Sequence, residues 1–407
     1  MVAVLLLGTQ ASAAMPGNGS EPARWITTAT TGGPFAQSPN LSAFGDGSAF
    51  ALFDGARAQP GEEGATGVGV IRSRDAGRTW DAPLTQPSFG GGGSVLAMAD
   101  GRTGFFASGD VVSRTQDGAS SWARLTVPRA VRKGAEYATA VAAGGGGRAA
   151  LLAKDGFEFA NGCPYLLRST PLQLTGDGGR SWATRSLPFT SYPIHAELAG
   201  PKRAVVTTFP YDYEEPVRDG DSCSVGGGLL NQVRHLVTSD AGRSWRTVQD
   251  CQVPCVAAWS DPATLMIVRR DGTVVASRDG GKTLRPLGRL PGVSAEAGQY
   301  VHAIDFLDRR IGYAAVYGAG TFRTDDGGKT WVLERREVEG AGVGTFADVA
   351  AIDGLRAVAA STSGIHARIA DPLPLATRST PATAAAGVGL RLDGTLALPG
   401  HRIPRAR

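Results

Sequence analysis

Two clusters of aromatic and acidic residues are the parts of this sequence whose side chains are best suited to chemistry. The first is Phe157-Glu158-Phe159, and the second is Tyr211-Asp212-Tyr213-Glu214-Glu215. Aromatic rings stack on sugar rings, and paired carboxyl groups act as acid, base or nucleophile when a glycosidic bond is cleaved. The clusters therefore predict a surface for carbohydrate, on which Tyr213 with Glu214 or Glu215 is the candidate catalytic group.

Both clusters lie in stretches that lengthen the chain between strand-like segments, about residues 154–164 and 209–231. Long ordered loops usually carry binding functions. Adjacent residues of a loop rarely point toward the same substrate atom, which speaks against Tyr213 and its neighbouring glutamates as a nucleophile pair. We therefore expect ligand recognition rather than hydrolysis. The candidate residues of the ligand face are Phe157, Glu158, Phe159, Tyr211 and Asp212.

A repeated eight-residue motif of the form S/T-x-D-x-G-x-T/S-W predicts the strands from which these loops extend. Its clearest copy is Ser73–Trp80, and its six aspartates are Asp75, Asp117, Asp177, Asp240, Asp279 and Asp326. An Asp followed two residues later by Gly suits a tight turn, since the carboxylate accepts backbone N–H groups and Gly adopts a positive φ. Each copy therefore predicts a turn between two antiparallel strands, with a structural rather than catalytic Asp.

The motif resembles the Asp-box, or BNR repeat, of the sialidase-like β-propellers, and the resemblance covers roughly residues 25–371. The copies recur at about forty residues, lengthened twice, which suits blades of four strands. The resemblance implies an all-β fold in which each box joins the third and fourth strands of a blade, away from the ligand face. The two insertions precede third strands, so we expect both to rise from the opposite face.

Both ends of the repeat region carry incomplete repeats. The segment 24–31 resembles the strand that follows each box, and residues 346–352, 355–360 and 364–369 resemble three strands whose box has eroded. A ring that is closed by the N-terminal strand combines these four segments into one blade. Six boxed blades and this composite blade predict a seven-bladed β-propeller, with a six-bladed ring as the alternative.

The resemblance to sialidases also bears on catalysis. Those enzymes bind the substrate carboxylate with three arginines, the first of which belongs to an Arg-Ile-Pro motif before the first box. The tripeptide here is Arg402-Ile403-Pro404, after the last blade, so that role is not assigned to it. The layout of a single propeller is also similar to the photosystem II assembly-factor family, which implies protein binding. We predict a non-catalytic recognition propeller for a glycan or protein partner; a sialidase-like glycoside hydrolase is the alternative.

The four cysteines predict two disulfides in an exported chain. Cys163 and Cys223 each lie in one insertion, whereas Cys251 and Cys255 flank a short segment that follows a fourth strand. We therefore predict the pairs Cys163–Cys223 and Cys251–Cys255, both on the ligand face. No C-x-x-C or histidine-rich spacing indicates zinc, so neither a metal nor a cofactor is predicted.

Residues 2–7 and 11–14 are typical of the end of a secretory signal peptide, which predicts a secreted or cell-envelope protein. The basic segment expected before them is missing, which leaves a start upstream of Met1 open. The predicted parts are a signal peptide (1–14), a flexible leader (15–24), the propeller (25–371) and a Pro/Ala-rich linker with a basic tail (372–407). No stretch is long enough to span a membrane. The 41 Lys and Arg only slightly outnumber the 37 Asp and Glu, and the arginines are scattered, so we expect no binding of nucleic acid. We also expect a monomer.

Overall fold

The computed structural model describes residues 24–30, 41–57, 66–81, 84–86, 94–128, 134–160, 163–166, 170–189, 191–211, 217–219, 222–224, 232–252, 254–336, 346–361 and 364–369. The predicted signal peptide, most of the leader, the linker and the basic tail lie outside the described residues. Residues Pro22–Ala370 form one compact unit. Every regular element in the described ranges is a β-strand, and none of these ranges holds a helix able to cross a membrane.

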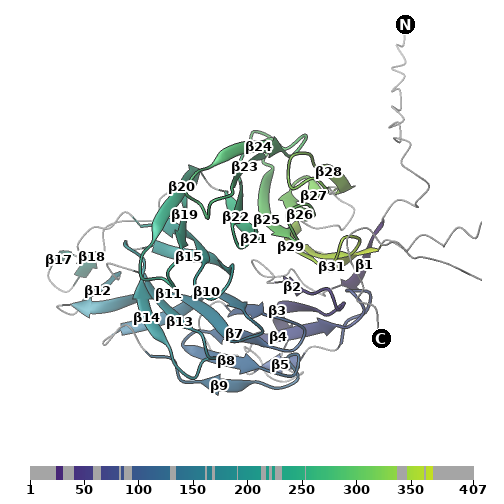
Figure 1. Cartoon of the computed structure of the whole chain (residues 1–407). Helices are drawn as coiled ribbons and strands as arrows, with labels where there is room; N and C mark the ends of the chain where they lie inside the picture. Colours follow the sequence, from purple (N-terminus) through teal and green to yellow (C-terminus); the bar gives the residue numbers. More distant parts are fainter. Residues whose placement is uncertain are drawn as a thin grey trace, which may run out of the picture. The chain divides into compact units, whose positions relative to one another are not determined.

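Seven antiparallel sheets follow one another along this unit, six of four strands and one of five (Figure 1). Blade 1 holds β2 (Leu41–Ala43), β3 (Ala49–Arg57), β4 (Thr66–Ser73) and β5 (Leu84–Gln86). Blade 2 holds β6 (Ser94–Met98), β7 (Gly104–Ser108), β8 (Val111–Thr115) and β9 (Ala123–Leu125). Blade 3 holds β10 (Gly134–Gly144), β11 (Ala149–Ala160), β13 (Pro171–Thr175) and β14 (Ala183–Ser186), with β12 (Cys163–Leu166) paired to β11.

The remaining blades keep the same order. Blade 4 holds β15 (Ser191–Leu198), β16 (Ala204–Pro210), β19 (Gln232–Thr238) and β20 (Arg246–Gln252), and a separate hairpin of β17 (Val217–Asp219) and β18 (Ser222–Ser224) lies between its second and third strands. Blade 5 holds β21 (Val256–Asp261), β22 (Thr264–Val268), β23 (Thr273–Ser277) and β24 (Arg285–Arg289). Blade 6 holds β25 (Tyr300–Phe306), β26 (Gly312–Tyr317), β27 (Gly320–Thr324) and β28 (Val332–Arg336).

The seventh blade confirms the predicted closure of the ring. Its strands are β29 (Phe346–Ala351), β30 (Ala357–Ser361), β31 (Gly364–Ile369) and, as the outermost strand, β1 (Arg24–Thr30). The purple β1 lies beside the yellow β31 in Figure 1. The chain thus forms a seven-bladed β-propeller, as the box repeats and the composite last blade predict.

A buried ion pair stabilises the closing strand. The guanidinium of Arg368 in β31 donates from Nε and from a terminal nitrogen to the carboxylate of Glu334 in β28, each at 2.6 Å. Trp25 Nε1 in β1 donates to the same carboxylate at 3.2 Å. Both charged side chains are largely buried, so losing either partner leaves an unpaired charge inside the protein, at a cost of about 3–5 kcal/mol.

The apolar core lies between neighbouring blades, because most second and third strands are buried on both faces. The run Thr264–Val268 in β22 is an example: it consists of β-branched and long apolar residues, and its last four side chains are buried. Met266 and Val274 of blade 5 belong to one buried cluster with Phe322 and Trp331 of blade 6. Each large side chain buried in this way contributes about 1.5–3 kcal/mol.

The six boxes lie between the third and fourth strands of blades 1–6, as the resemblance implies, and they repeat one hydrogen-bond pattern. In blade 6, Asp326 accepts from the Thr324 hydroxyl at 2.9 Å, from the backbone N–H of Lys329 at 3.0 Å, and from the N–H and hydroxyl of Thr330 at 2.9 and 2.6 Å. In blade 3, hydrogen bonds from the side chain and backbone of Ser181, and then from Thr175, hold the pKa of Asp177 well below its usual range.

In five of the six boxes, a glycine two residues after the Asp also permits close packing between blades; the box of blade 2 has Ala119 there, with φ +65°. Gly77 has φ +79°, and a Cβ at this position would lie 2.4 Å from Val358 Cγ1 of blade 7. Gly328 has φ +87°, and its Cβ would lie 2.9 Å from Met266 Cε of blade 5. The box therefore places its own turn against the preceding blade, and at Gly77 and Gly328 the space left for a side chain is too small for a Cβ.

Candidate functional site

The sequence-predicted ligand-face residues lie largely outside the described part of the chain. Phe157, Glu158 and Phe159 lie in β11, where their backbones pair with β12, but the positions of their side chains are not described. Tyr211 follows β16 and is half-buried. Asp212, Tyr213, Glu214 and Glu215 lie outside the described residues, as do the side chains of Cys163 and Cys223.

The connections that carry these residues are of one kind. The first insertion lies between β11 and β13, and the second lies between β16 and β19, so both join the second and third strands of neighbouring blades. Successive antiparallel strands alternate in direction, which puts these connections on the face opposite the boxes. The connections from a fourth strand to the next first strand share that face, which we call the loop face.

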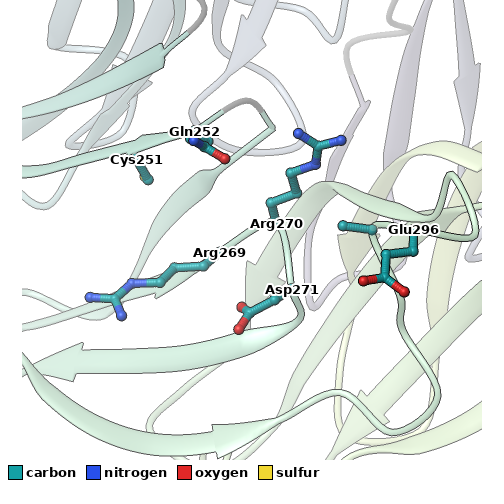
Figure 2. A pocket seen from close by; sticks show the side chains of 7 residues that line it. Cys251, Gln252, Arg269, Arg270, Asp271 and Glu296 are labelled. Carbon is teal, nitrogen blue, oxygen red and sulfur yellow. The ribbon is translucent and has the colours of Figure 1, made fainter.

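A cavity of about 460 Å³ lies on the described part of the loop face. Its walls come from the end of β20, from the β22–β23 turn and from the segment between β24 and β25, that is, from connections of blades 4, 5 and 6. Its lining residues are Cys251, Gln252, Arg269, Arg270, Asp271, Ala295 and Glu296. Figure 2 shows Arg269 and Arg270 leaving the turn in different directions, with Glu296 on the side of Arg270.

Two of these charged groups are fixed by the protein. Arg269 donates to Gln249 Oε1 at 3.0 Å. Asp271 accepts from the backbone N–H and the hydroxyl of Thr273 at 2.9 and 2.7 Å. Burial acts to raise the pKa of Asp271, but the hydrogen bonds from Thr273 outweigh it and lower the pKa below its ordinary value. Asp271 is therefore ionised at neutral pH and does not act as a general acid.

The other polar groups of the cavity face solvent. Gln252, Arg270 and Glu296 are exposed. Within one small cavity, the guanidinium offers charged hydrogen-bond donors, the carboxylate offers charged acceptors, and the amide offers a neutral donor and a neutral acceptor. Such a mixed set can bind a polyhydroxyl or zwitterionic ligand without a metal or a covalent step.

A pair of stacked tyrosines lies on the same face, where the chain leaves the cavity segment. Tyr300 begins β25 directly after the cavity segment, and Tyr317 ends β26 opposite it. Their ring centroids are 4.5 Å apart with an interplanar angle of 6°, and the His302 ring lies 5.0 Å from Tyr300. The Tyr317 side chain is 36% exposed. The pair provides an aromatic surface beside the polar cavity.

The segment that joins the cavity to the tyrosines is held by hydrogen bonds. Gln299 donates its backbone N–H to Ser294 O and accepts from Ser294 N at Oε1, both at 3.1 Å. The same side chain donates to Gly318 O at 3.0 Å, next to Tyr317. The rim is therefore preformed, which lowers the entropy cost of binding a ligand.

The disulfide beside the cavity lies against a buried histidine. Cys251 at the end of β20 is bonded to Cys255 before β21, with an S–S distance of 2.09 Å. His235 Nε2 lies 3.3 Å from Cys255 Sγ, and His235 Nδ1 lies 2.9 Å from Thr207 Oγ1. Burial lowers the pKa of His235 to about 3, and the nearby His195 acts in the same direction. The imidazole is therefore neutral at physiological pH.

Three half-buried carboxylates of first strands form a second polar group. Glu197 accepts from Trp259 N at 3.0 Å, Asp305 from Ala351 N at 2.7 Å, and Asp348 from Leu41 N at 2.8 Å. In each pair the acceptor lies in one blade and the donor in the next. Burial raises the pKa of Glu197 to about 8 and that of Asp348 to about 7, and the charge of Asp305 acts on both in the same direction. These groups connect blades rather than form part of the loop-face cavity.

Sequence reasoning missed the cavity, the tyrosine pair and the first-strand carboxylates. The carboxylates had a weak signal, since Asp305 and Asp348 interrupt otherwise apolar strand segments. The cavity residues had none, because they are brought together from three blades by the curvature of the ring.

Known proteins resemble this chain in fold. No protein-family model matches the sequence, and no curated protein matches it significantly. A solved streptogramin B lyase has a TM-score of 0.54 and 11% identity over 86% of this chain and 98% of its own. The WD40 repeats of RRP9 have a TM-score of 0.53 and 10% identity over 88% and 99%, and YCF48 from Cyanidioschyzon merolae has 0.49 and 15% over 85% and 98%. The chain is a β-propeller with Asp-box turns. At these identities the likeness shows the fold alone.

Proposed function

We propose that this propeller is a non-catalytic recognition module whose loop face binds a glycan. The observation that carries the proposal is the cavity of about 460 Å³ with the stacked pair Tyr300 and Tyr317 beside it. Aromatic rings supply stacking surface for sugar rings, and the exposed polar groups of the cavity supply hydrogen bonds for hydroxyl groups. Arg270 adds a preference for acidic sugars, because its guanidinium binds carboxylates in a two-pronged geometry.

The charge state of Asp271 speaks against this residue as the acid of a hydrolase. Hydrolysis of a glycoside needs a carboxylic acid that is protonated at working pH. The hydrogen bonds from Thr273 keep Asp271 ionised. The alternative, a sialidase-like hydrolase that uses Tyr213, Glu214 or Glu215, predicts turnover that does not depend on Arg270.

The proposal includes an extracytoplasmic location and a monomeric state. The Cys251–Cys255 disulfide supports the location, since disulfides persist in oxidising compartments. Cell fractionation, with antibody detection of the protein in medium, envelope and cytosol, tests the location directly. Recovery from the cytosol alone contradicts it.

A glycan array probed with the purified, oxidised protein tests the binding function. We expect binding to a subset of glycans, reduced about tenfold by Tyr317→Ala and by Arg270→Ala. Arg243→Ala is the matched control, because Arg243 is an exposed arginine on the box face, and it should leave binding unchanged. Absence of any glycan binding, or an equal loss in the control, contradicts the proposal.

A panel of fluorogenic sialosides and other aryl glycosides separates the two functions. We expect no release of the fluorophore. Turnover that is abolished by Tyr213→Phe or Glu214→Gln would establish the hydrolase instead. Capture of a protein by the wild type, lost in Arg270→Ala and kept in Arg243→Ala, would retain the loop face as the binding surface and replace the glycan with a protein partner.

A further inference from the structure

Three side chains that can bind a metal converge beside the cavity. Sγ of Cys251, Sγ of Cys255 and Nε2 of His235 all lie within 4.8 Å of one another. They come from the end of β20, from the residue before β21 and from β19, so they join blade 4 to blade 5. His235 and Cys255 are buried, and Cys251 lines the cavity.

The donor set is that of a zinc site with three protein ligands. Zinc binds cysteine sulfur at about 2.3 Å and histidine nitrogen at about 2.0–2.1 Å, so tetrahedral ligand atoms lie roughly 3.5–3.8 Å apart. The 3.3 Å between His235 Nε2 and Cys255 Sγ is already close to that spacing. Because Cys251 lines the cavity, a water molecule or a ligand group from the cavity can supply the fourth ligand.

A neighbouring hydroxyl orients the histidine. Thr207 Oγ1 lies 2.9 Å from His235 Nδ1, and the two residues are directly opposite each other on β16 and β19. Both side chains are buried. The hydroxyl can accept from Nδ1, and this contact fixes the orientation of the ring and leaves the other nitrogen for a metal. Here the nitrogen that remains is the one that faces the sulfur atoms.

We propose that reduction of the Cys251–Cys255 disulfide creates a Zn²⁺ site of Cys251, Cys255 and His235. Two equivalents of a thiol reductant supply two electrons and two protons: the Cys251–Cys255 bond breaks, the reductant forms its own disulfide, and both cysteines become thiols. Zn²⁺ then binds both sulfurs as thiolates and releases the two protons. The disulfide and the metal are alternative states of one site, and the metal-bound state places a Lewis acid at the edge of the cavity.

Cobalt titration of the intact protein under anaerobic conditions tests the site, since Co²⁺ substitutes for Zn²⁺ and reports thiolate ligands by a charge-transfer band. After reduction with a phosphine that does not bind metal tightly, we expect one equivalent of Co²⁺ to bind and to be displaced by Zn²⁺. The oxidised protein should bind none. Absence of the band in the reduced protein, or unfolding on reduction seen by circular dichroism, overturns the proposal.

Alkylation with iodoacetamide followed by mass mapping identifies the ligands. In the reduced protein with Zn²⁺ we expect Cys251 and Cys255 to be protected, while Cys163 and Cys223 react and serve as the control within the same chain. Thr207→Val should weaken Co²⁺ binding about tenfold, and His235→Gln should weaken it further. Protection of Cys163 and Cys223 instead, or undiminished binding by Cys255→Ser, overturns the assignment.

Discussion

The box face and the loop face of this propeller use polar residues in opposite ways. On the box face, six turns repeat the same hydrogen bonds, and each Asp satisfies donors of its own turn. On the loop face, Gln252, Arg270 and Glu296 are exposed, come from three different connections and have no repeated counterpart. Repetition marks a structural role shared by the six boxed blades, whereas the departures from repetition mark where a ligand can bind.

The largest expected effect is on the box face, at Gly77→Ala. The new methyl group would lie 2.4 Å from Val358 Cγ1, in a residue with φ +79°. Overpacking and left-handed strain together should lower the free energy of unfolding by about 2–4 kcal/mol, measured by urea denaturation. Gly280→Ala is the control: its φ is +71° and nothing lies within 4 Å of the added carbon, so it should cost only about 1 kcal/mol. Equal losses would show that inter-blade packing plays no part.

A comparison of two aspartates sharpens the contrast between the faces. Asp326→Ala removes the acceptor of hydrogen bonds from Thr324, Lys329 and Thr330, and should cost about 2 kcal/mol in urea unfolding. Asp271→Ala, on the loop face, removes only the acceptor for Thr273 and should cost about 1 kcal/mol or less. A larger loss of unfolding free energy for Asp271→Ala than for Asp326→Ala would contradict the view that the box aspartates contribute more to stability.

The pH dependence of stability should have opposite signs for box and first-strand carboxylates. The pKa of Asp177 is lowered in the folded state, so its contribution is present above its ordinary pKa and is lost as the pH falls. The pKa of Glu197 is raised to about 8, so the folded state binds the extra proton and stability falls as the pH rises from about 4.5 to 8, by up to about 1.4 kcal/mol per pH unit.

Glu197→Gln isolates that alkaline loss, because the amide oxygen can still accept from Trp259 N. In urea unfolding, we expect the free energy of unfolding of the variant to fall less between pH 5 and pH 8 than that of the wild type. Its loss of stability at acid pH, which comes from the box aspartates, should be unchanged. An unchanged decline in the variant would assign the loss to other groups.

The smallest effect on stability is expected at the loop-face arginine. Arg270 is exposed, and no described packing depends on its guanidinium, so Arg270→Ala should change the free energy of unfolding by less than about 0.5 kcal/mol. Arg243→Ala on the box face should behave alike. The two variants are therefore expected to differ in ligand binding alone. If Arg270→Ala were destabilised, its reduced binding could no longer be assigned to the loss of a contact with the ligand.

The sequence was sufficient for the fold because the fold is local and repeated. Each box specifies one turn through residues within eight positions, and the unboxed segments at the two ends complement each other as one blade. The closure of β1 onto β31 could therefore be predicted, although Thr27 and His366 are 339 residues apart.

The candidate site could not be read in the same way, because it depends on contacts between blades. His235 and Cys255 are twenty residues apart and meet because Cys255 is bonded to Cys251 of β20, the strand that pairs with β19. Tyr300 and Tyr317 lie opposite each other on one hairpin, but nothing in their spacing shows that they lie on the same face as Arg270 of the preceding blade. The aromatic and acidic insertions remain a prediction, since their side chains lie outside the described residues.

The outermost strand of the last blade has a consequence for synthesis. The ribosome makes β1 first and its partner β31 last, and at 5–20 residues per second the intervening chain takes roughly 20–70 s to produce. Throughout that time Arg24–Thr30 has an unpaired edge that can pair with any other exposed strand. The blades can form one by one as they emerge, but the ring cannot close until the final strand is complete, so the nascent chain needs protection at its beginning rather than at its end.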